Sequence, residues 1–464
     1  MLTVTNASVH VDQYNALQRI YYSFGGSYWT YNLNGAPNEN KIWFNKYHPD
    51  PCYPEPWYGL GCSQDNTTIT NITLREFNLV GKMQSNTFQG LNTTIHMDWY
   101  NNSISGRLSK SLTASRHSLV YLDLGRNLLS GTIPTWISEF AAMETFYVNQ
   151  NMLTGTFPTG LCELSTKLLQ FQLYFNKLNG SLPSCVGNLT NLTKFSVGNN
   201  AFTGSIPDSL YECQRLYYLD LQSNFFVGPL VDLFRLPRLV YTYFQNNSFG
   251  GRIYNNITYM QNLIVLGLSE NRFTGTIPIN IGNMIALQGL YLYQNFLVGP
   301  VPQTISSLDR LQIMLIRDNE LTGTLPIGIG YLKDLLYLDI SNNKLSGEVP
   351  SALFTSMVNL ELLLMSGNGF AGQLPSMEYN LQLNQFDASN NRFTGEIPIT
   401  LMTLPNLTLL SCAVNCLSLV ISSSICETTS IQQLYLSGLS RSPSCSSFID
   451  KYLVKESNLP TCIW

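Results

Sequence analysis

Residues 122–131, with the sequence LDLGRNLLSG, carry the pattern that decides the fold. The same frame, L-x-L-x-x-N-x-L-x-G, returns at 219–228, 266–275, 290–299, 338–347 and 363–372. Its Asn recurs at intervals of 23 to 25 residues, at Asn102, Asn127, Asn151, Asn176, Asn200, Asn224, Asn247, Asn271, Asn295, Asn319, Asn343, Asn368, Asn391 and Asn415. Irregular turns, one around Ile72 and Leu74 and one at Leu434 and Leu436, bring the number of repeats to about sixteen.

Each repeat predicts one short strand followed by a turn. The L-x-L pair places alternate side chains inside the coil, and successive strands stack in parallel about 4.8 Å apart. The Asn side chain at the end of the strand can satisfy backbone groups that no regular structure pairs, and the Gly four residues later permits the positive φ of a bend. We therefore expect an α/β repeat solenoid of about 16 turns of 24 residues, with a parallel β-sheet on its concave face.

The composition excludes several classes of function. Charged residues make up 12% and hydrophobic residues 44% of the 464 residues, and the net charge is −4. The surface must therefore consist mainly of Ser, Thr, Asn, Gln and Tyr, and no basic patch is present that would bind nucleic acid. No stretch approaches the roughly 20 apolar residues that span a bilayer, so we expect no transmembrane segment in this chain.

A second motif follows the Asn, where ten repeats read G-x-x-P, as in TGTIP at 274–278 and SGEVP at 346–350. This L-x-G-x-I-P form resembles the plant-specific subclass of leucine-rich repeats, which occurs in receptor-kinase ectodomains and polygalacturonase-inhibiting proteins. The resemblance covers roughly residues 70–420, although 228–231 and 251–254 lack the Pro. It implies a right-handed leucine-rich-repeat superhelix that binds peptides, partner receptors or cell-wall enzymes.

An open solenoid exposes its core at both ends and needs a cap at each. Residues 12–26 show apolar side chains at helical spacing, with Asp12 as the N-cap and two glycines ending the predicted helix. The pattern D-P-C, followed by W-x-G and a second Cys, resembles the N-terminal cap that accompanies such repeats, and it implies a Cys52–Cys62 disulfide. We expect an N-terminal cap over 1–70, repeats over 71–415 and a C-terminal cap over 416–464.

The other cysteines are assigned by their place in the repeat. Cys162 and Cys185 flank the same inward position in adjacent turns, which predicts a disulfide on the convex side. Cys213 and Cys412 occupy inward positions and are expected as buried free thiols. The C-terminal cap holds two further bonds of open connectivity among Cys416, Cys426, Cys445 and Cys462. Cysteines gathered in caps favour an extracellular protein, secreted or associated with the cell surface; reduced thiols in a cytosolic repeat protein are the alternative.

Eleven N-x-S/T sequons make the chain a candidate glycoprotein, although chance alone gives about eight. The candidate glycosylation sites are Asn6, Asn66, Asn71, Asn92, Asn101, Asn179, Asn188, Asn191, Asn246, Asn256 and Asn406. Their number by itself does not establish secretion.

Nothing in the sequence forms a constellation for catalysis. The four histidines lack the spacing of a metal site, and neither a nucleophile elbow nor a phosphate-binding loop occurs. Asp220 and Asp339 share one strand position but lie five turns apart, about 24 Å at strand spacing, too far for paired carboxylate catalysis. His96 near Asp98 is better explained as a surface pair than as a dyad. We expect no catalytic residue, no metal site and no cofactor.

Tyrosine is enriched on the strands. The solvent-facing strand positions lie two, four and six residues before each frame Asn; uniform placement would put about two tyrosines there, and ten are found. Strand propensity and cross-strand stacking account for only part of this excess. Rigid aromatic side chains are typical of recognition surfaces. We predict a ligand-binding surface formed by Tyr100, Tyr121, Tyr147, Tyr174, Tyr218, Tyr241, Tyr243, Tyr291, Tyr293, Arg317, Tyr337 and Asp339.

Two functions of different class fit these observations. The first is an extracellular, non-catalytic binding module that takes a protein, peptide or glycan on its Tyr-rich concave face. The second is a structural subunit of an extracellular matrix, cell wall or filament, which would bind assembly neighbours along its length. Low charge and a polar surface suit both functions.

Overall fold

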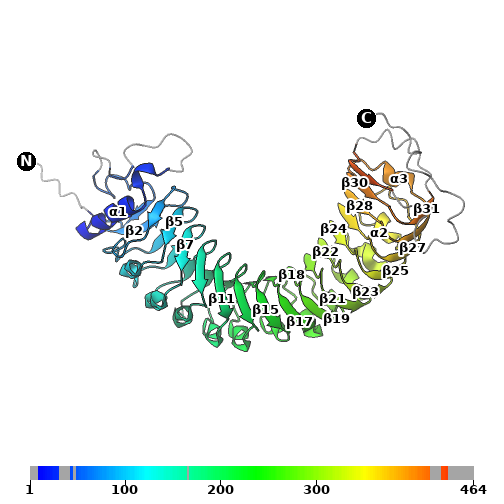
Figure 1. Ribbon diagram of the computed structural model, residues 1–464, viewed down its shortest axis with the longest axis horizontal. Coiled ribbons are helices and arrows are strands. Elements are labelled where there is room, and N and C mark those ends of the chain that lie inside the picture. The colour runs from blue at the N-terminus through cyan, green and yellow to red at the C-terminus, as the bar shows by residue number, and fades with distance from the viewer. Residues whose placement is uncertain (1–8, 31–41, 45–48, 165–166, 419–429, 437–464) are drawn as a thin grey trace, which may run out of the picture. The chain divides into compact units, whose positions relative to one another are not determined.

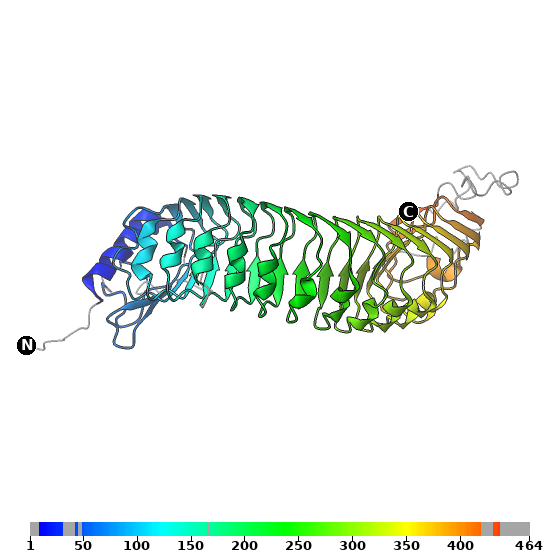
Figure 2. The same ribbon diagram turned by 90° about the horizontal axis from the view of Figure 1, so that it is seen from below.

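The computed structural model describes residues 9–30, 42–44, 49–164, 167–418 and 430–436 (Figure 1). The chain divides into two units, residues 1–227 and 228–464, and each is described by itself. Within each unit the strands of successive repeats line one face, and short helical segments line the opposite face (Figures 1 and 2). These two faces are called the strand face and the helical face.

In the N-terminal unit each repeat contributes one strand to a parallel sheet. Strands in neighbouring repeats pair in register, so that Tyr121 lies beside Thr145 and Lys194 lies beside Tyr218. At the start, β1 (Leu60–Cys62) pairs antiparallel with β2. The parallel strands are β2 (Ile69–Thr73), β4 (His96–Asp98), β6 (Tyr121–Asp123), β8 (Thr145–Tyr147), β10 (Gln170–Gln172), β12 (Lys194–Ser196) and β14 (Tyr218–Asp220).

A second parallel row of strands follows the frame Asn in the same unit. It consists of β3 (Val80–Lys82), β5 (Ser103–Gly106), β7 (Leu128–Gly131), β9 (Met152–Gly155), β11 (Lys177–Ser181), β13 (Ala201–Gly204) and β15 (Phe225–Gly228). The helices of the unit are α1 (Val11–Ser23), η1 (Gly26–Tyr28), η3 (Lys110–Ser115), η4 (Thr135–Glu139), η5 (Thr159–Leu164), η6 (Ser184–Asn188) and η7 (Asp208–Glu212).

The C-terminal unit repeats this arrangement. Its first row contains β16 (Tyr241–Tyr243), β18 (Val265–Gly267), β20 (Gly289–Tyr291), β22 (Ile313–Leu315), β24 (Tyr337–Asp339), β26 (Leu362–Leu364), β28 (Gln385–Asp387), β30 (Leu409–Ser411) and β32 (Gln433–Tyr435). Its second row contains β17 (Ser248–Arg252), β19 (Arg272–Gly275), β21 (Phe296–Gly299), β23 (Glu320–Gly323), β25 (Lys344–Glu348), β27 (Gly369–Gln373), β29 (Arg392–Glu396) and β31 (Cys416–Ser418). Its helices are η8 (Leu233–Arg235), η9 (Asn255–Tyr259), η10 (Ile281–Asn283), η11 (Gln303–Ser307), η12 (Ile327–Tyr331), α2 (Ala352–Thr355) and α3 (Ile399–Met402).

The frame Asn joins each repeat to the one before it. The Nδ2 group of Asn127 donates hydrogen bonds to the carbonyls of Trp99, Leu124 and Gly125 at 3.0, 3.1 and 3.1 Å, and Oδ1 accepts one from the Ile104 amide at 3.0 Å. One buried side chain therefore satisfies four backbone groups in two adjacent repeats. The L-x-L residues on either side are fully buried and form the core.

The N-terminal helix differs from its prediction at both ends. Helix α1 begins at Val11, with His10 as its N-cap, and ends at Ser23. Asp12 therefore lies in the first turn of the helix, where its charge is favourable to the helix dipole, and the predicted capping role was wrong. The predicted parallel sheet with one strand per repeat is confirmed, and the described residues hold sixteen such strands.

The described cysteines have definite partners or environments. Cys52 bonds to Cys62 and Cys162 bonds to Cys185, with Cα–Cα distances of 6.0 and 5.7 Å. Cys213 and Cys412 are buried free thiols. Cys416 is disulfide-bonded. The remaining candidates of the C-terminal cap, Cys426, Cys445 and Cys462, lie outside the described residues.

Candidate binding surface

All ten predicted tyrosines lie on the strand face, and all ten are half-buried. Seven lie within the first-row strands, and Tyr100, Tyr174 and Tyr293 lie two residues after the end of theirs. These side chains pack against their neighbours: the ring of Tyr121 stacks on His96 at a centroid distance of 4.2 Å and meets Tyr147 edge-on at 5.9 Å. The row is thus a packed aromatic surface rather than a set of free side chains.

Burial affects the acidity of this surface. It raises the pKa of Tyr147 to about 12, and it raises the pKa values of Tyr174, Tyr291 and Tyr293 as well. The pKa of Tyr337 rises for another reason, because its hydroxyl donates a hydrogen bond to the Glu361 carboxylate at 3.0 Å. All these hydroxyls are therefore neutral donors at physiological pH.

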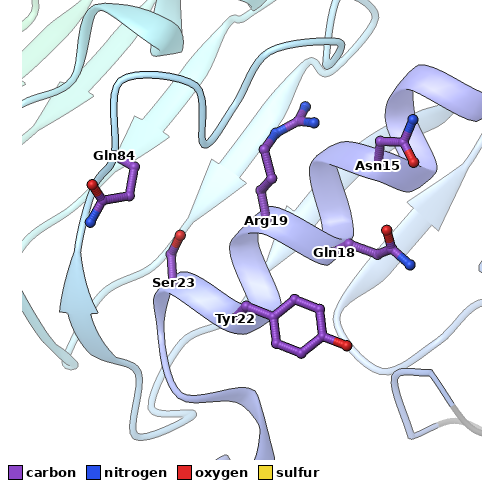
Figure 3. A pocket seen from close by; sticks show the side chains of 6 residues that line it. All are labelled: Asn15, Gln18, Arg19, Tyr22, Ser23 and Gln84. Atoms are coloured by element: carbon purple, nitrogen blue, oxygen red, sulfur yellow. The ribbon is translucent and has the colours of Figure 1, made fainter.

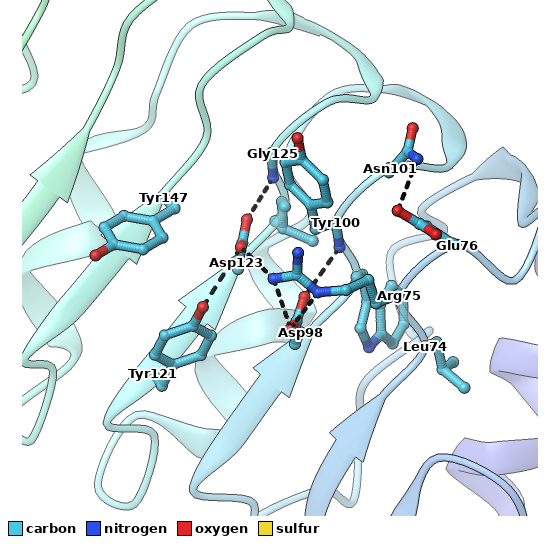
Figure 4. Close-up of polar contacts among 12 residues, drawn as sticks. Leu74, Arg75, Glu76, Asp98, Tyr100, Asn101, Tyr121, Asp123, Gly125 and Tyr147 are labelled. Atoms are coloured by element: carbon cyan, nitrogen blue, oxygen red, sulfur yellow. Dashed lines mark hydrogen bonds and ion pairs between the residues drawn. The ribbon is translucent and has the colours of Figure 1, made fainter. Parts of the chain in front are cut away.

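The first repeats of the N-terminal unit hold a charged group that we call the Arg75 cluster: Arg75, Asp98, Tyr100 and Asp123 (Figure 4). The Arg75 guanidinium contacts Asp98 at 2.9 Å and Asp123 at 3.4 Å, and it lies over the Tyr100 ring at 4.5 Å. Asp98 and Asp123 are register partners on adjacent strands, so their carboxylates lie close together. Burial and the neighbouring Asp98 raise the pKa of Asp123 to about 6.

A similar group, the Arg317 cluster, occurs in the C-terminal unit and consists of Tyr293, Arg317, Asp318 and Asp339. Arg317 forms ion pairs with Asp318 and, at 3.3 Å, with Asp339, and it lies over the Tyr293 ring at 4.6 Å. Both arginines are therefore held by two carboxylates and one aromatic ring. Neither guanidinium is a free cation that could receive an acidic ligand.

The sequence reasoning missed Arg75, Asp98 and Asp123 as members of the surface. Asp98 precedes Asp123 by one repeat length and occupies the same strand position, so the period itself was the available signal. Arg75 lies in the irregular first repeat, where Phe77 replaces the frame Asn. The paired carboxylates were overlooked because the spacing was measured between more distant repeats.

Four aliphatic side chains form a patch on the strand face of the C-terminal unit. Ile313 and Leu315 on β22 and Leu362 and Leu364 on β26 flank β24 in register. All four are half-buried, and the inward residues of the same strands already fill the core. Burial in the core therefore does not explain these side chains, and apolar groups gathered on a surface are typical of an interaction site. We call this set the aliphatic patch.

An open hollow of about 660 Å³ adjoins the aliphatic patch. Tyr337 and Leu362 line it on one side, and Gln385, Asn406 and Gln432 line it from later repeats.

A second concavity, of about 580 Å³, lies beside α1, where Arg19 and Gln84 are among its lining residues (Figure 3). Arg19 already donates hydrogen bonds to the backbone carbonyls of Asn86 and Gln89, so this concavity belongs to the packing of the cap.

The predicted glycosylation sites differ in exposure. Six of them are exposed: Asn71, Asn92, Asn179, Asn188, Asn246 and Asn406. Four are half-buried: Asn66, Asn101, Asn191 and Asn256. Asn6 lies outside the described residues. The exposed side chains are the better candidates for a bulky modification.

Among the described residues, no group of three or more His, Cys, Asp or Glu side chains could hold a metal ion. The helices in the described ranges are also too short or too polar to cross a membrane.

Comparisons with known proteins place this geometry among leucine-rich repeats. The Leucine Rich Repeat family model matches residues 118–140, 262–284 and 334–356. A comparison of the sequence with curated proteins found no match. The repeats and the parallel first-row sheet are those of a leucine-rich-repeat solenoid.

Three solved structures illustrate the likeness. The ectodomain of the Arabidopsis receptor kinase HAESA, in complex with an extended IDA peptide hormone, is 28% identical over 91% of this chain and 73% of that one, with a TM-score of 0.74. The plant peptide hormone receptor RGFR1, in complex with RGF2, is 27% identical with a TM-score of 0.69; the match covers 77% of this chain and 61% of the receptor chain. A leucine-rich-repeat protein of Leptospira interrogans is 28% identical over 71% and 80%, with a TM-score of 0.59.

Proposed function

We propose that this chain is a non-catalytic extracellular binding module whose strand face recognises a peptide or protein. The observation that carries the proposal is the aliphatic patch, which places four apolar side chains on solvent-facing positions around Tyr337 and Asp339. Apolar and aromatic anchors surrounded by polar groups are the usual centre of a protein interface. A peptide or protein partner is favoured over a glycan because aliphatic side chains offer a sugar no hydrogen bond.

Two further observations support this function. The HAESA and RGFR1 structures are complexes with peptide hormones, and their chains share this fold. The Cys52–Cys62 and Cys162–Cys185 disulfides suit an oxidising, extracellular environment. Peptide recognition on the strand face of the C-terminal unit would use its five tyrosines of the predicted surface as rigid contacts and the Arg317 cluster as a polar rim.

The proposal is tested by replacing Tyr241, Tyr243, Tyr291 and Tyr293 together with Ala. Peptides are first selected from a random 12-residue display library against the unmodified protein. Loss of four aromatic contacts is expected to weaken the selected peptides at least about tenfold, since single anchors contribute up to about 2 kcal/mol or more. Because these rings are half-buried, a melting curve measured in parallel separates lost contacts from lost stability.

The matched control replaces four exposed tyrosines of the same unit on its helical side, Tyr254, Tyr259, Tyr331 and Tyr379. This control is expected to leave peptide affinity unchanged. Equal loss in both variants, or loss in the control alone, would exclude the strand face as the binding surface.

A further inference from the structure

The hollow beside the aliphatic patch contains a carboxylate that pairs with no cation among the described residues. Glu361 directly precedes β26, and its Oε2 accepts the hydrogen bond of the Tyr337 hydroxyl at 3.0 Å. No Lys, Arg or His is among the described residues that line the hollow. None of the ion pairs in the described part of the chain includes Glu361. The described lining of the hollow therefore carries one negative charge.

The remaining lining offers hydrogen-bond acceptors. The side-chain amides of Gln382, Gln385 and Gln432 have no hydrogen-bond partner among the described residues. An amide oxygen accepts the N–H groups of a cation, and a carboxylate receives a planar guanidinium in two parallel hydrogen bonds. Tyr337 also lines the hollow, and an aromatic ring attracts a cation placed over its face.

We propose that this hollow binds the arginine side chain of a peptide partner, with Glu361 as its counter-ion. The proposal rests on the proposed function, because it requires that a peptide binds to the same strand face and states that this peptide carries a positively charged side chain. The adjacent aliphatic patch would take an apolar side chain of that peptide. The hollow, at about 660 Å³, lies in the range of small-ligand sites.

The charges around the hollow favour a cationic ligand. Among the described strand-face positions of the C-terminal unit, Arg317 is the one basic residue, and it is already paired with Asp318 and Asp339. An acidic ligand would meet Glu361 without a cation to offset the repulsion. A neutral sugar would form hydrogen bonds with the amides equally well but would gain nothing from the Glu361 charge. Removing this charge should therefore weaken the binding of a cation and leave the binding of a sugar unchanged.

The test uses saturation-transfer NMR on the full chain with three probes: Nα-acetyl-arginine amide, its uncharged isostere Nα-acetyl-citrulline amide, and methyl glucoside. Variant Glu361→Gln keeps the shape and the hydrogen bond to Tyr337 and removes only the charge. Variant Glu396→Gln, at an exposed position on β29 of the same unit, is the control for net charge. Both variants carry Asn406→Gln, as does the reference protein, because a glycan on Asn406 would lie at the hollow.

We expect the arginine probe to bind the reference protein, and Glu361→Gln to weaken it at least about fivefold while Glu396→Gln leaves it unchanged. The citrulline probe should bind more weakly and should not distinguish the three proteins. Equal binding of arginine and citrulline, equal effects of the two glutamine variants, or preferred binding of methyl glucoside would each overturn the proposal. If the arginine probe does not bind the reference protein while peptides are still selected by it, the hollow is not a cation site and the proposed function still stands.

Discussion

Asp220 shows how burial on the strand face changes the pKa of a single residue. Its side chain is 3% exposed on β14, where it accepts hydrogen bonds from the Ser196 hydroxyl at 2.8 Å and the Gln222 amide at 3.2 Å. Burial nevertheless raises its pKa to about 6. Between the ordinary carboxyl pKa near 4 and this raised value, the folded chain holds a proton that the unfolded chain has lost. The contribution of Asp220 to stability therefore falls as the pH rises through this window.

Replacing Asp220 with Asn should remove this penalty. The variant is expected to raise the free energy of unfolding by up to about 3 kcal/mol at pH 7.5, and the gain should shrink towards zero as the pH approaches 4. Urea unfolding at several pH values measures the difference. Asp309→Asn, at an exposed position, serves as the control. A gain that is the same at pH 4 and pH 7.5 would show that the ionisation of Asp220 is not its cause.

Other properties of single residues could not be predicted from the sequence. Half-burial of the tyrosines depends on which side chains the adjacent repeats place beside them, as His96 does for Tyr121. The residue before the frame Asn adopts a left-handed backbone even where it is Phe175 or Val414, with φ of 52° and 53°. Because the side chains at this position vary, the sequence gives no indication of the left-handed conformation there.

At the scale of the element, the frame Asn connects adjacent strands. In the C-terminal unit, Asn271 is 7% exposed; its Oδ1 accepts from the Phe249 amide at 3.0 Å, and its Nδ2 donates to the carbonyls of Phe244, Leu268 and Ser269. Removing this side chain leaves several buried backbone groups without a partner. Each such group costs about 1 to 3 kcal/mol.

We therefore expect Asn271→Ala to lower the free energy of unfolding by at least about 2 kcal/mol. Contacts in a solenoid run between neighbours, so amide hydrogen exchange should accelerate first in the repeats around residues 244–273. Asn283→Ala, at an exposed position at the end of η10, should change stability by less than about 0.5 kcal/mol. Equal effects of the two substitutions would show that the hydrogen bonds of Asn271 are not needed for stability.

The first-row strands were predictable because inward leucines and the Asn recur at one period. The second row, from β3 to β31, was not predicted, because all its strands except β31 contain the glycine that follows the frame Asn, and a glycine there indicates a turn. At Gly347, for example, φ is 81°, and a Cβ atom would lie 2.7 Å from the Thr324 side chain. Glycine at this position permits the repeats to stack closely. From the sequence pattern alone, the same glycine indicates only a bend in the chain.

At the scale of the molecule, the period of the repeat predicts the architecture, whereas the grouping of side chains on the surface depends on which residues adjacent strands place side by side. The tyrosine row was visible in the sequence because one residue type was enriched. The aliphatic patch was not singled out, because Leu and Ile are also the residues of the core. The repeat frame places its four residues at solvent-facing positions, and the register of β22, β24 and β26 brings them together around Tyr337 and Asp339. The division into caps over 1–70 and 416–464 stays a prediction.

The central claim is that partners bind the strand face, and site-specific photo-crosslinking tests it most directly. A benzophenone amino acid is placed at Leu364, in the aliphatic patch, or at Ile327, which is 79% exposed in η12 on the helical face. Each protein is irradiated with the selected peptides, and the crosslinked product is measured by mass spectrometry. We expect a crosslink from Leu364 and none from Ile327. Crosslinking from Ile327 with none from Leu364 would contradict binding at the strand face.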